Sequence, residues 1–285
     1  MQGSARRGVV CGVASALTVL WLGTTAAAQS PRLKNIELCN DVRRTSPDSQ
    51  MSACTALIDA GRQSGDSPRL LAIAHNNRGN VYTARGEYDL AIRDYDQSIK
   101  IDPKNAKSFN NRGVAYQKKG EHDRAIEDFD EAIKLDSGYA SPFVNRAESH
   151  RNKGDYQRAV RDYDEAIRLQ PASHLVWNGR CWTRALAGAF QAALADCNEA
   201  LRLQPNVAAP WDSRGFTYLK MAQWDSALAD YGSALRLDPR LASSLYGRGF
   251  AKLKKGDTTG GDADIAAARA IEPNIIAEFA RYGVQ

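Results

Sequence analysis

The fold is decided by residues 106–139, AKSFNNRGVAYQKKGEHDRAIEDFDEAIKLDSGY, and by residues 140–173, ASPFVNRAESHRNKGDYQRAVRDYDEAIRLQPAS, which follow without a gap. Written one above the other, the two stretches share Arg at position 7, Gly at position 15, Ala at position 20 and Asp at position 23. The same frame extends in both directions, from Ala72 to Ile275, and gives six units of 34 residues. A fixed period of this length predicts an array of stacked repeats.

Each unit is expected to form two helices joined by a tight turn. Apolar residues follow helical spacing over positions 1–14 and 18–31. Glycine separates these runs at position 15 in five units, with Ala222 at that place in the other, and proline ends the second run at position 32 in five units. Small residues at positions 8, 20 and 27 let the two helices approach closely. One such hairpin has to stack on its neighbours to bury both of its faces.

These recurring residues carry a resemblance to a known family. In the first unit they are Gly79, Tyr82, Gly86, Tyr88, Ala91, Tyr95 and Pro103, and in the second Gly113, Tyr116, Gly120, Ala125, Phe129 and Ala132. On these residues the chain resembles the tetratricopeptide repeat family. The resemblance implies an all-α fold, a right-handed α-solenoid of six helix-turn-helix repeats, with a concave groove that binds extended peptides.

The N-terminus reads as an export signal. Arg6 and Arg7 precede the apolar run Val9–Leu22, and Ala26–Ala28 offers small residues for cleavage. The run has 14 residues, fewer than the roughly 18–20 needed to cross a bilayer. A periplasmic, possibly secreted, protein is therefore the favoured interpretation, and a retained signal anchor is the alternative.

The rest of the chain divides around the repeats. Leu33–Arg44 and Ser49–Gly61 are expected to form a helical hairpin split by Pro47, and Gly260-Gly261 is expected to interrupt the second helix of the sixth unit. The expected segments are a signal peptide (1–28), an N-terminal helical hairpin (29–71), six repeats (72–275) and a C-terminal capping segment (276–285) in which Phe279 and Tyr282 lie on a short helix.

Four cysteines remain once Cys11 is removed with the leader, an even number for an oxidising compartment. Cys181 and Cys197 occupy positions 8 and 24 of one unit, which face each other across the hairpin. Cys39 and Cys54 lie on the two helices of the N-terminal hairpin. We predict the disulfides Cys39–Cys54 and Cys181–Cys197, with four free thiols as the alternative.

A charged pair recurs in every unit, at positions 7 and 23, which lie at similar height on the two helices. This spacing predicts a structural ladder of Arg–Asp pairs along the array. Its members are Arg78 and Asp94, Arg112 and Asp128, Arg146 and Asp162, Arg180 and Asp196, Arg214 and Asp230, and Arg248 and Asp264.

No residue pattern indicates catalysis. The four histidines fall at unrelated positions of their units without metal-ligand spacing, and no nucleophile, zinc-protease or phosphate-loop motif occurs. The stretch Gly256–Asp264 reads as a degenerate turn rather than a cation loop. The net charge of +5 comes without a basic block, which argues against nucleic acid as a partner. We therefore expect no enzyme, no cofactor and no metal.

The expected groove carries two kinds of side chain. Asparagines fill its N-terminal half and continue into the fourth unit, and their amides could hold a peptide backbone: Asn76, Asn80, Asn110, Asn111, Asn145 and Asn178. The C-terminal half is expected to expose an aromatic row, which would mark a contact site: Trp182, Phe216, Tyr246 and Phe250. The asparagines at position 6, Asn111 and Asn145 among them, could instead satisfy the backbone of the hairpin, and Phe216 and Phe250 could instead pack against neighbouring helices.

These features favour a periplasmic scaffold or adaptor that binds an extended segment of another protein in its groove. The alternative is an assembly component of an envelope complex, or a homo-oligomer, that acts through its outer surface. A third hypothesis, glycan binding or glycan chemistry at Trp177, Trp182 and Trp211, lacks the paired carboxylates that such chemistry requires. We expect no membrane span once the leader is removed.

Overall fold

The computed structural model describes residues 30–41, 46–64 and 67–284, and within these ranges the chain forms fifteen helices and no strand. The expected signal peptide, with Cys11, lies outside the described residues. Six helix pairs correspond to the six repeats: α3 (Pro68–Ala84) and α4 (Tyr88–Ile101), α5 (Ala106–Lys118) and α6 (His122–Leu135), α7 (Ala140–Asn152) and α8 (Tyr156–Leu169), α9 (His174–Leu186) and α10 (Phe190–Leu203), α11 (Ala208–Lys220) and α12 (Trp224–Leu237), and α13 (Ala242–Lys254) and α14 (Thr258–Ile271).

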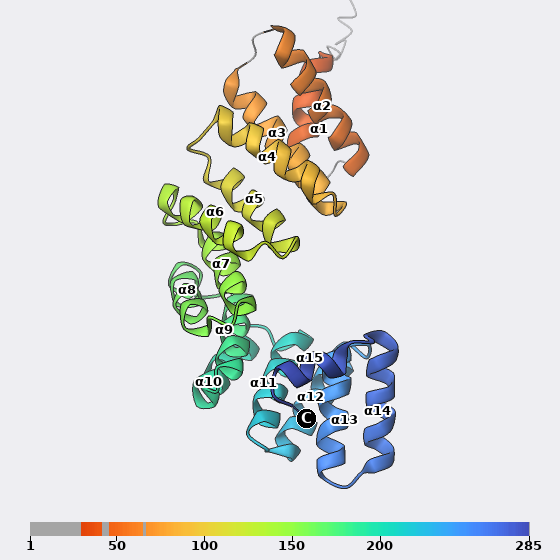
Figure 1. The fold of residues 1–285 in the computed structure, drawn as a ribbon. Coiled ribbons are helices and arrows are strands. Elements are labelled where there is room, and N and C mark those ends of the chain that lie inside the picture. The colour runs from red at the N-terminus through yellow and green to blue at the C-terminus, as the bar shows by residue number, and fades with distance from the viewer. Residues whose placement is uncertain (1–29, 42–45, 65–66, 285) are drawn as a thin grey trace, which may run out of the picture.

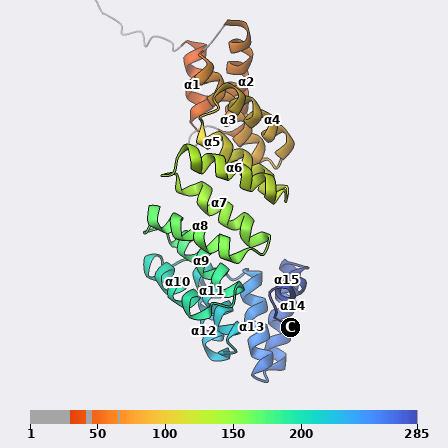
Figure 2. The ribbon, with the colours of Figure 1, turned by 60° about the vertical axis from the view of Figure 1, so that its left-hand side comes forward.

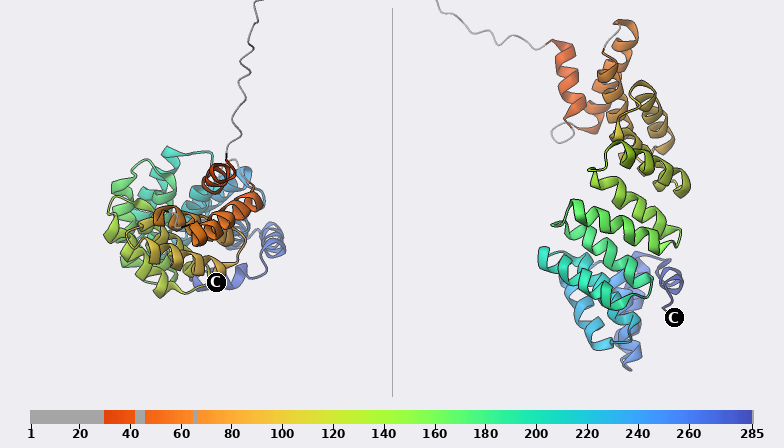
Figure 3. Two further views of the ribbon diagram at one scale, coloured as in Figure 1. Left: turned by 90° about the horizontal axis from the view of Figure 1, so that it is seen from above. Right: turned by 90° about the vertical axis from the view of Figure 1, so that its left-hand side faces the viewer.

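The helix pairs stack into an elongated, curved array (Figure 1), which the turned view in Figure 2 shows as successive layers. Seen from above, the helices surround a common axis (Figure 3). The N-terminal hairpin, α1 (Pro31–Asn40) and α2 (Pro47–Ser64), begins the array. The prediction of an all-α solenoid of tandem repeats is confirmed.

The first helices of the repeats form the inner side of the curve. Each first helix contacts the first helix of the next repeat, from α3 to α5 and onward to α13, whereas successive second helices of the described repeats do not touch. A stack bends toward the side on which its members lie closest together. The odd-numbered helices from α3 to α13 therefore present the inner face, and their partners present the outer face.

Glycine at position 8 determines how closely the two helices of a repeat approach. A Cβ atom added to Gly79 or Gly113 would lie 2.6 Å from the ring of Tyr95 or Phe129 at position 24, well inside van der Waals contact. In the fourth repeat Cys181 and Cys197 occupy these two positions, with their sulfur atoms 1.89 Å apart and their Cα atoms 5.4 Å apart. A cysteine pair thus stands where other repeats place a small residue against a ring.

The N-terminal hairpin forms, but its helices begin elsewhere than expected. Pro47 is the first residue of α2 rather than part of the turn, and α3 begins at Pro68, ahead of the expected start of the repeats at Ala72. Proline suits the first turn of a helix because its fixed φ is compatible and its missing N–H has no helical acceptor there. Cys39 and Cys54 pair as predicted, with sulfur atoms 2.07 Å apart.

The expected interruption at Gly260-Gly261 is wrong. α14 begins at Thr258, and the Asp257 side chain accepts a hydrogen bond from the Gly260 N–H at 2.9 Å, which satisfies one of the free donors of the first turn. Gly261 serves packing, because a Cβ atom there would lie 2.6 Å from the Leu253 side chain. The two glycines therefore lie in the first turn of a continuous helix.

The C-terminal segment contains a helix, α15 (Ile275–Arg281), as expected, but it does not simply close the end of the stack. It folds back across the array (Figure 1) and contacts α13 and α14, while its side chains reach aromatic residues of α9 and α11. Ile275, Phe279 and Val284 are all buried. The chain thus ends on its own inner face.

Candidate functional site

The predicted Arg–Asp pairs connect the two helices of every repeat. In all six, Arg Nε donates to one carboxylate oxygen at 2.6–3.0 Å and Nη2 donates to the other at 2.6–2.8 Å. The six carboxylates are buried. Bidentate, charge-assisted contacts of this kind are strong and directional, so each pair fixes the relative height of its two helices.

A second set of contacts joins neighbouring repeats. The third guanidinium nitrogen, Nη1, of Arg112, Arg146 and Arg180 reaches an aspartate of the preceding repeat, at 2.5–2.6 Å. These aspartates are Asp96, Asp130 and Asp164, all at position 25 of their units. Arg214 finds Asn198 there at 2.6 Å, and Gly232 supplies no side chain for Arg248. Between repeats the ladder therefore consists of ion pairs up to Arg180, of a hydrogen bond to an uncharged acceptor at Arg214, and, within the described residues, of no such contact at Arg248.

The pKa values of the ladder carboxylates are shifted in different directions by their surroundings. Burial raises the pKa of Asp94, but hydrogen bonds from Arg78 and His75 outweigh burial and the net pKa is lowered. In the next repeat burial prevails over the hydrogen bonds from Arg112, and the pKa of Asp128 is raised. The second donor, His75 Nδ1 at 2.8 Å from Asp94, accounts for part of this difference.

The asparagines of the N-terminal half bond mainly to one another. Asn111 Nδ2 donates to Asn76 and Asn80 of the preceding repeat at 3.1 and 3.0 Å, and Asn145 Nδ2 donates to Asn110 at 2.9 Å. These residues therefore tie successive first helices together. They leave fewer free amide groups for a ligand than the sequence suggests, and a ligand-binding role for them stays a prediction.

The aromatic row of the C-terminal half is not exposed as a row. Phe216 and Tyr246 are 1% and 6% exposed, because Phe279 of α15 packs on both rings at centroid distances of 6.0 and 4.5 Å. Trp182 stays half-buried, 4.5 Å from Phe216 and 5.5 Å from Tyr282. The expectation of an exposed aromatic surface is wrong, because the chain covers that surface with its own C-terminal helix.

Phe250 also packs within the protein. Its ring lies against Trp224 of α12 at 6.4 Å and against Tyr246 at 6.5 Å. The Nζ atom of Lys254 lies 4.8 Å from the ring centroid. Phe250 is therefore a half-buried packing residue beside the covered row.

The inner face retains a cavity of about 600 Å³ next to α15. Glu148, Asp212 and Glu278 supply negative charge to its walls, and Arg151 is its cation. Burial raises the pKa of Asp212 to about 6, although Ser244 and Ser243 donate hydrogen bonds to it at 2.5 and 3.1 Å.

Asn178 lines the same cavity and differs from the other asparagines. Its Oδ1 atom is buried and has no hydrogen-bond partner in the described part of the chain. A buried acceptor without a donor is costly, and a backbone N–H of a bound segment would satisfy it. Asn178 is thus the predicted groove residue that offers an unused hydrogen-bonding group.

Two features are missing from the described residues. These residues contain no cluster of three or more His, Cys, Asp or Glu side chains arranged to hold a metal ion. In the same ranges no helix has both the length and the apolar character required to cross a bilayer.

Comparison with family models gives three matches. Residues 79–120 match a model described as TPR repeat, and residues 106–139 and 144–208 match models described as tetratricopeptide repeat. The chain is a tetratricopeptide repeat protein. Its matched residues extend from the first repeat through the fourth, and the regular helix pairs extend the same architecture to the sixth.

Solved structures show the same fold in other tetratricopeptide repeat proteins. One from Parabacteroides merdae aligns with a TM-score of 0.70 and 19% identity, over 89% of this chain and 98% of its own. The pilF protein of Pseudomonas aeruginosa aligns with a TM-score of 0.61 and 20% identity, over 73% of this chain and 96% of its own. The protein TTC0263 of Thermus thermophilus aligns with a TM-score of 0.53 and 22% identity, over 64% and 99%. No curated protein sequence matches the chain.

Several residues that connect the repeats or line the cavities escaped sequence reasoning. Asp96, Asp130 and Asp164 recur at one position of three consecutive units, a signal that could have predicted the contacts between repeats. Arg281 and Glu278 had no such signal, because α15 follows the last repeat and the period says nothing about where it packs.

Proposed function

We propose that this tetratricopeptide repeat protein is a non-enzymatic scaffold that binds an extended segment of a partner protein along its inner face, beside α15. The tetratricopeptide fold supports protein–protein interaction in general. Our proposal adds two specific points: the inner face is the binding surface, and the ligand is an extended segment.

The observation that carries the proposal is the position of α15. The inner face already holds one short polypeptide segment, whose Phe279 packs against Phe216 of α11 and Tyr246 of α13. Lys220 Nζ donates to the carbonyl oxygens of Tyr282 and Gly283 at 2.6 and 3.3 Å. A surface that binds its own chain through side-chain packing and main-chain contacts is suited to bind another.

The cavity next to α15 supports the same conclusion. Asn178 Oδ1 offers an acceptor, and the half-buried Ser243, which donates to Asp212, adds a further polar group to the lining. Leu175 projects here with 67% of its surface exposed. Together they provide a polar site for a main chain and an apolar contact for a side chain, which extended segments require.

A periplasmic location is part of the proposal. Its support is the leader-like sequence of residues 1–28 and the two cysteine pairs at bonding distance, because disulfides persist in oxidising compartments.

Photo-crosslinking tests the proposal. A photoreactive amino acid at Leu175, on the inner face, is compared with one at Leu237, which is 44% exposed at the end of the second helix α12. We expect one defined partner adduct from position 175 and none from position 237 when cells are irradiated. An adduct from position 237 alone, or equal adducts from both positions, would contradict binding at the inner face and favour the outer surface.

A further inference from the structure

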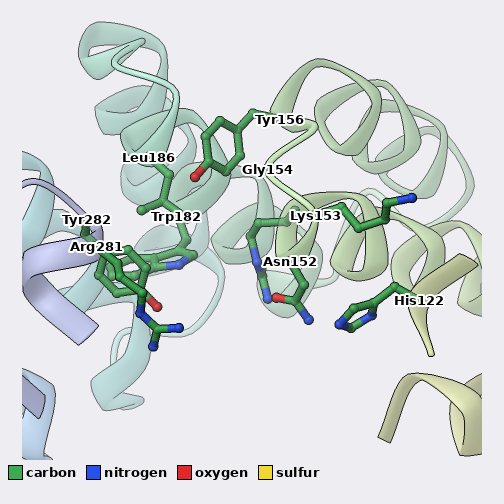
Figure 4. Close-up of a pocket in the computed structure, with 10 residues that line it drawn as sticks. His122, Asn152, Lys153, Gly154, Tyr156, Trp182, Leu186, Arg281 and Tyr282 are labelled. Atoms are coloured by element: carbon green, nitrogen blue, oxygen red, sulfur yellow. The ribbon is translucent and has the colours of Figure 1, made fainter. Parts of the chain in front are cut away.

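A second cavity of about 600 Å³ lies where α15 meets the middle of the array (Figure 4). Its walls come from the second, third and fourth repeats and from α15. Arg151, Trp182 and Tyr282 line both this cavity and the one beside Asn178, so the two are neighbours. A segment bound along the inner face would therefore pass its entrance.

The charged side chains that line this second cavity are cationic. They are Arg151, Lys153 and Arg281, and no acidic residue is among the described residues of the lining. Lys153 forms an ion pair with Asp123, and Arg151 donates to the Tyr163 hydroxyl at 3.2 Å. The guanidinium of Arg281 makes no hydrogen bond or ion pair within residues 30–41, 46–64 and 67–284.

Further polar and aromatic side chains complete the lining. Figure 4 shows Arg281 on one side of the cavity and His122 on the other, with Asn152 between them. The Nδ1 atom of His122 is buried and has no hydrogen-bond partner in the described part of the chain. Trp182 and Tyr156 add aromatic surface. The cavity thus combines the donors of Arg151, Lys153 and Arg281 with other polar side chains and with aromatic walls.

We propose that this cavity binds an oxyanion, a carboxylate or phosphoryl group carried by the segment that the inner face holds, a step that rests on the proposed function. Such a group has only acceptors, matches the planar donors of Arg281 and Arg151, and neutralises cations that otherwise repel one another. The side chain next to the oxyanion packs on Trp182.

This site is distinct from the asparagine row. Its cations lie at the C-terminal end of α7, where Arg151 is in the last turn and Lys153 follows the helix, and at Arg281 on α15. It exists only because α15 folds back, which brings Arg281 to the third repeat. The C-terminal helix therefore has two roles: it covers the aromatic row and completes an anion site.

Small anions test the inference on the full-length protein without a partner. Inorganic phosphate and glutarate are titrated at constant ionic strength against sodium chloride, while nuclear magnetic resonance follows the tryptophan indole N–H signals. We expect a saturable shift of the Trp182 signal. The signals of Trp177 and Trp211 should stay in place, because their indoles donate to the carbonyls of Pro171 and Pro205 at 2.9 Å. A response to phosphate alone or to glutarate alone identifies the kind of oxyanion.

Variants of one exposed residue give the decisive comparison. Arg281→Ala should weaken anion binding about tenfold, since a charge-assisted contact is lost, and Arg281→Lys should restore part of it. Arg269→Ala, which removes an exposed arginine of α14, should leave binding unchanged. The inference is overturned if Trp182 responds to sodium chloride as it does to the anions, or if Arg281→Ala binds them equally well. Crosslinking at Leu175 does not depend on Arg281, so a partner adduct without an anion response would reject this inference alone.

Discussion

The two halves of the array use one repeat frame but are held together differently. From the first to the fourth repeat, arginines bridge each repeat to the one before, and the buried apolar residues form separate small clusters. From Cys181 to Val284 a single aromatic and aliphatic cluster runs through three repeats and α15. There the ion pairs between repeats end, because Arg214 meets the uncharged Asn198 and Gly232 offers Arg248 no side chain.

This contrast shows that stacking in a solenoid can be achieved by directional polar contacts or by continuous apolar burial. In the polar half, from the first to the third repeat, asparagines of successive first helices bond to one another. The apolar half has to be covered, and α15 covers it. The open cavities lie between the two, at the third and fourth repeats.

The largest loss of stability is expected from a substitution in the apolar half. Phe216→Ala should lower the free energy of unfolding by about 3–5 kcal/mol, because it opens a cavity in a buried cluster. Phe109→Ala is the matched variant of the polar half, where the ring is half-buried and the loss should be about 1–2 kcal/mol. Urea denaturation followed by circular dichroism measures both. Equal losses would show that the halves do not differ in this way.

The next largest loss of stability is expected when an arginine of the Arg–Asp ladder is replaced. Arg146→Ala leaves the buried Asp162 without its ion partner and should cost about 3 kcal/mol. Arg248→Ala should cost less, because Lys252 still pairs with Asp264 at 2.8 Å and no contact between repeats is lost. A double-mutant cycle of Arg146→Ala and Asp162→Ala should be strongly non-additive; additive losses in urea denaturation would refute the ladder as a stabilising unit.

Asp212 and Asp94 should make the stability of the protein depend on pH in opposite directions. The pKa of Asp212 is raised by burial to about 6, above its ordinary 3.8, so its contribution to stability is present below about pH 4 and is lost as pH rises through 6. Asp212→Asn should therefore stabilise the protein at pH 7.5 by about 1–3 kcal/mol and have little effect near pH 4.

Asp94 is the matched case in the polar half. Its pKa is lowered from 3.8 because hydrogen bonds from Arg78 and His75 outweigh burial, so its contribution is present above that value and is lost as pH falls below it. Asp94→Asn should destabilise the protein at pH 7.5. Thermal melts from pH 3 to pH 8 compare the two variants, and a shift of the same sign at neutral pH would contradict the assignment.

The smallest effect concerns a single contact between repeats. The Asp130 side chain is 56% exposed where it meets Arg146, so Asp130→Asn should cost about 0–1 kcal/mol at low salt and nothing in 1 M sodium chloride. Glu131→Gln serves as the control, because Glu131 pairs with Lys134 inside one helix. If the two variants show the same loss and the same salt response, contacts between repeats add nothing beyond an ordinary surface pair.

Much of the fold could be predicted from the sequence because its determinants are local. The period fixes the hairpins, and residues 16 apart, such as Arg146 and Asp162 or Cys181 and Cys197, face each other across one turn. The bonding among asparagines was harder to predict, since it depends on how one repeat rotates against the next.

The position of α15 could not be predicted. α15 does not follow the 34-residue frame, so the period does not determine its position, and burial of Phe216 and Tyr246 decides where it packs. The cavities at the third and fourth repeats depend on that choice. The sequence therefore predicted the repeats that line the site but not Arg281, which completes it.

Hydrogen exchange of the protein bound to its crosslinked partner, monitored by mass spectrometry, tests the central claim most directly. Binding along the inner face predicts slower exchange in α7, α9 and α15 than in the free protein, with α8 and α10 unchanged. Slower exchange confined to α8 and α10 would place the partner on the outer face and contradict the claim.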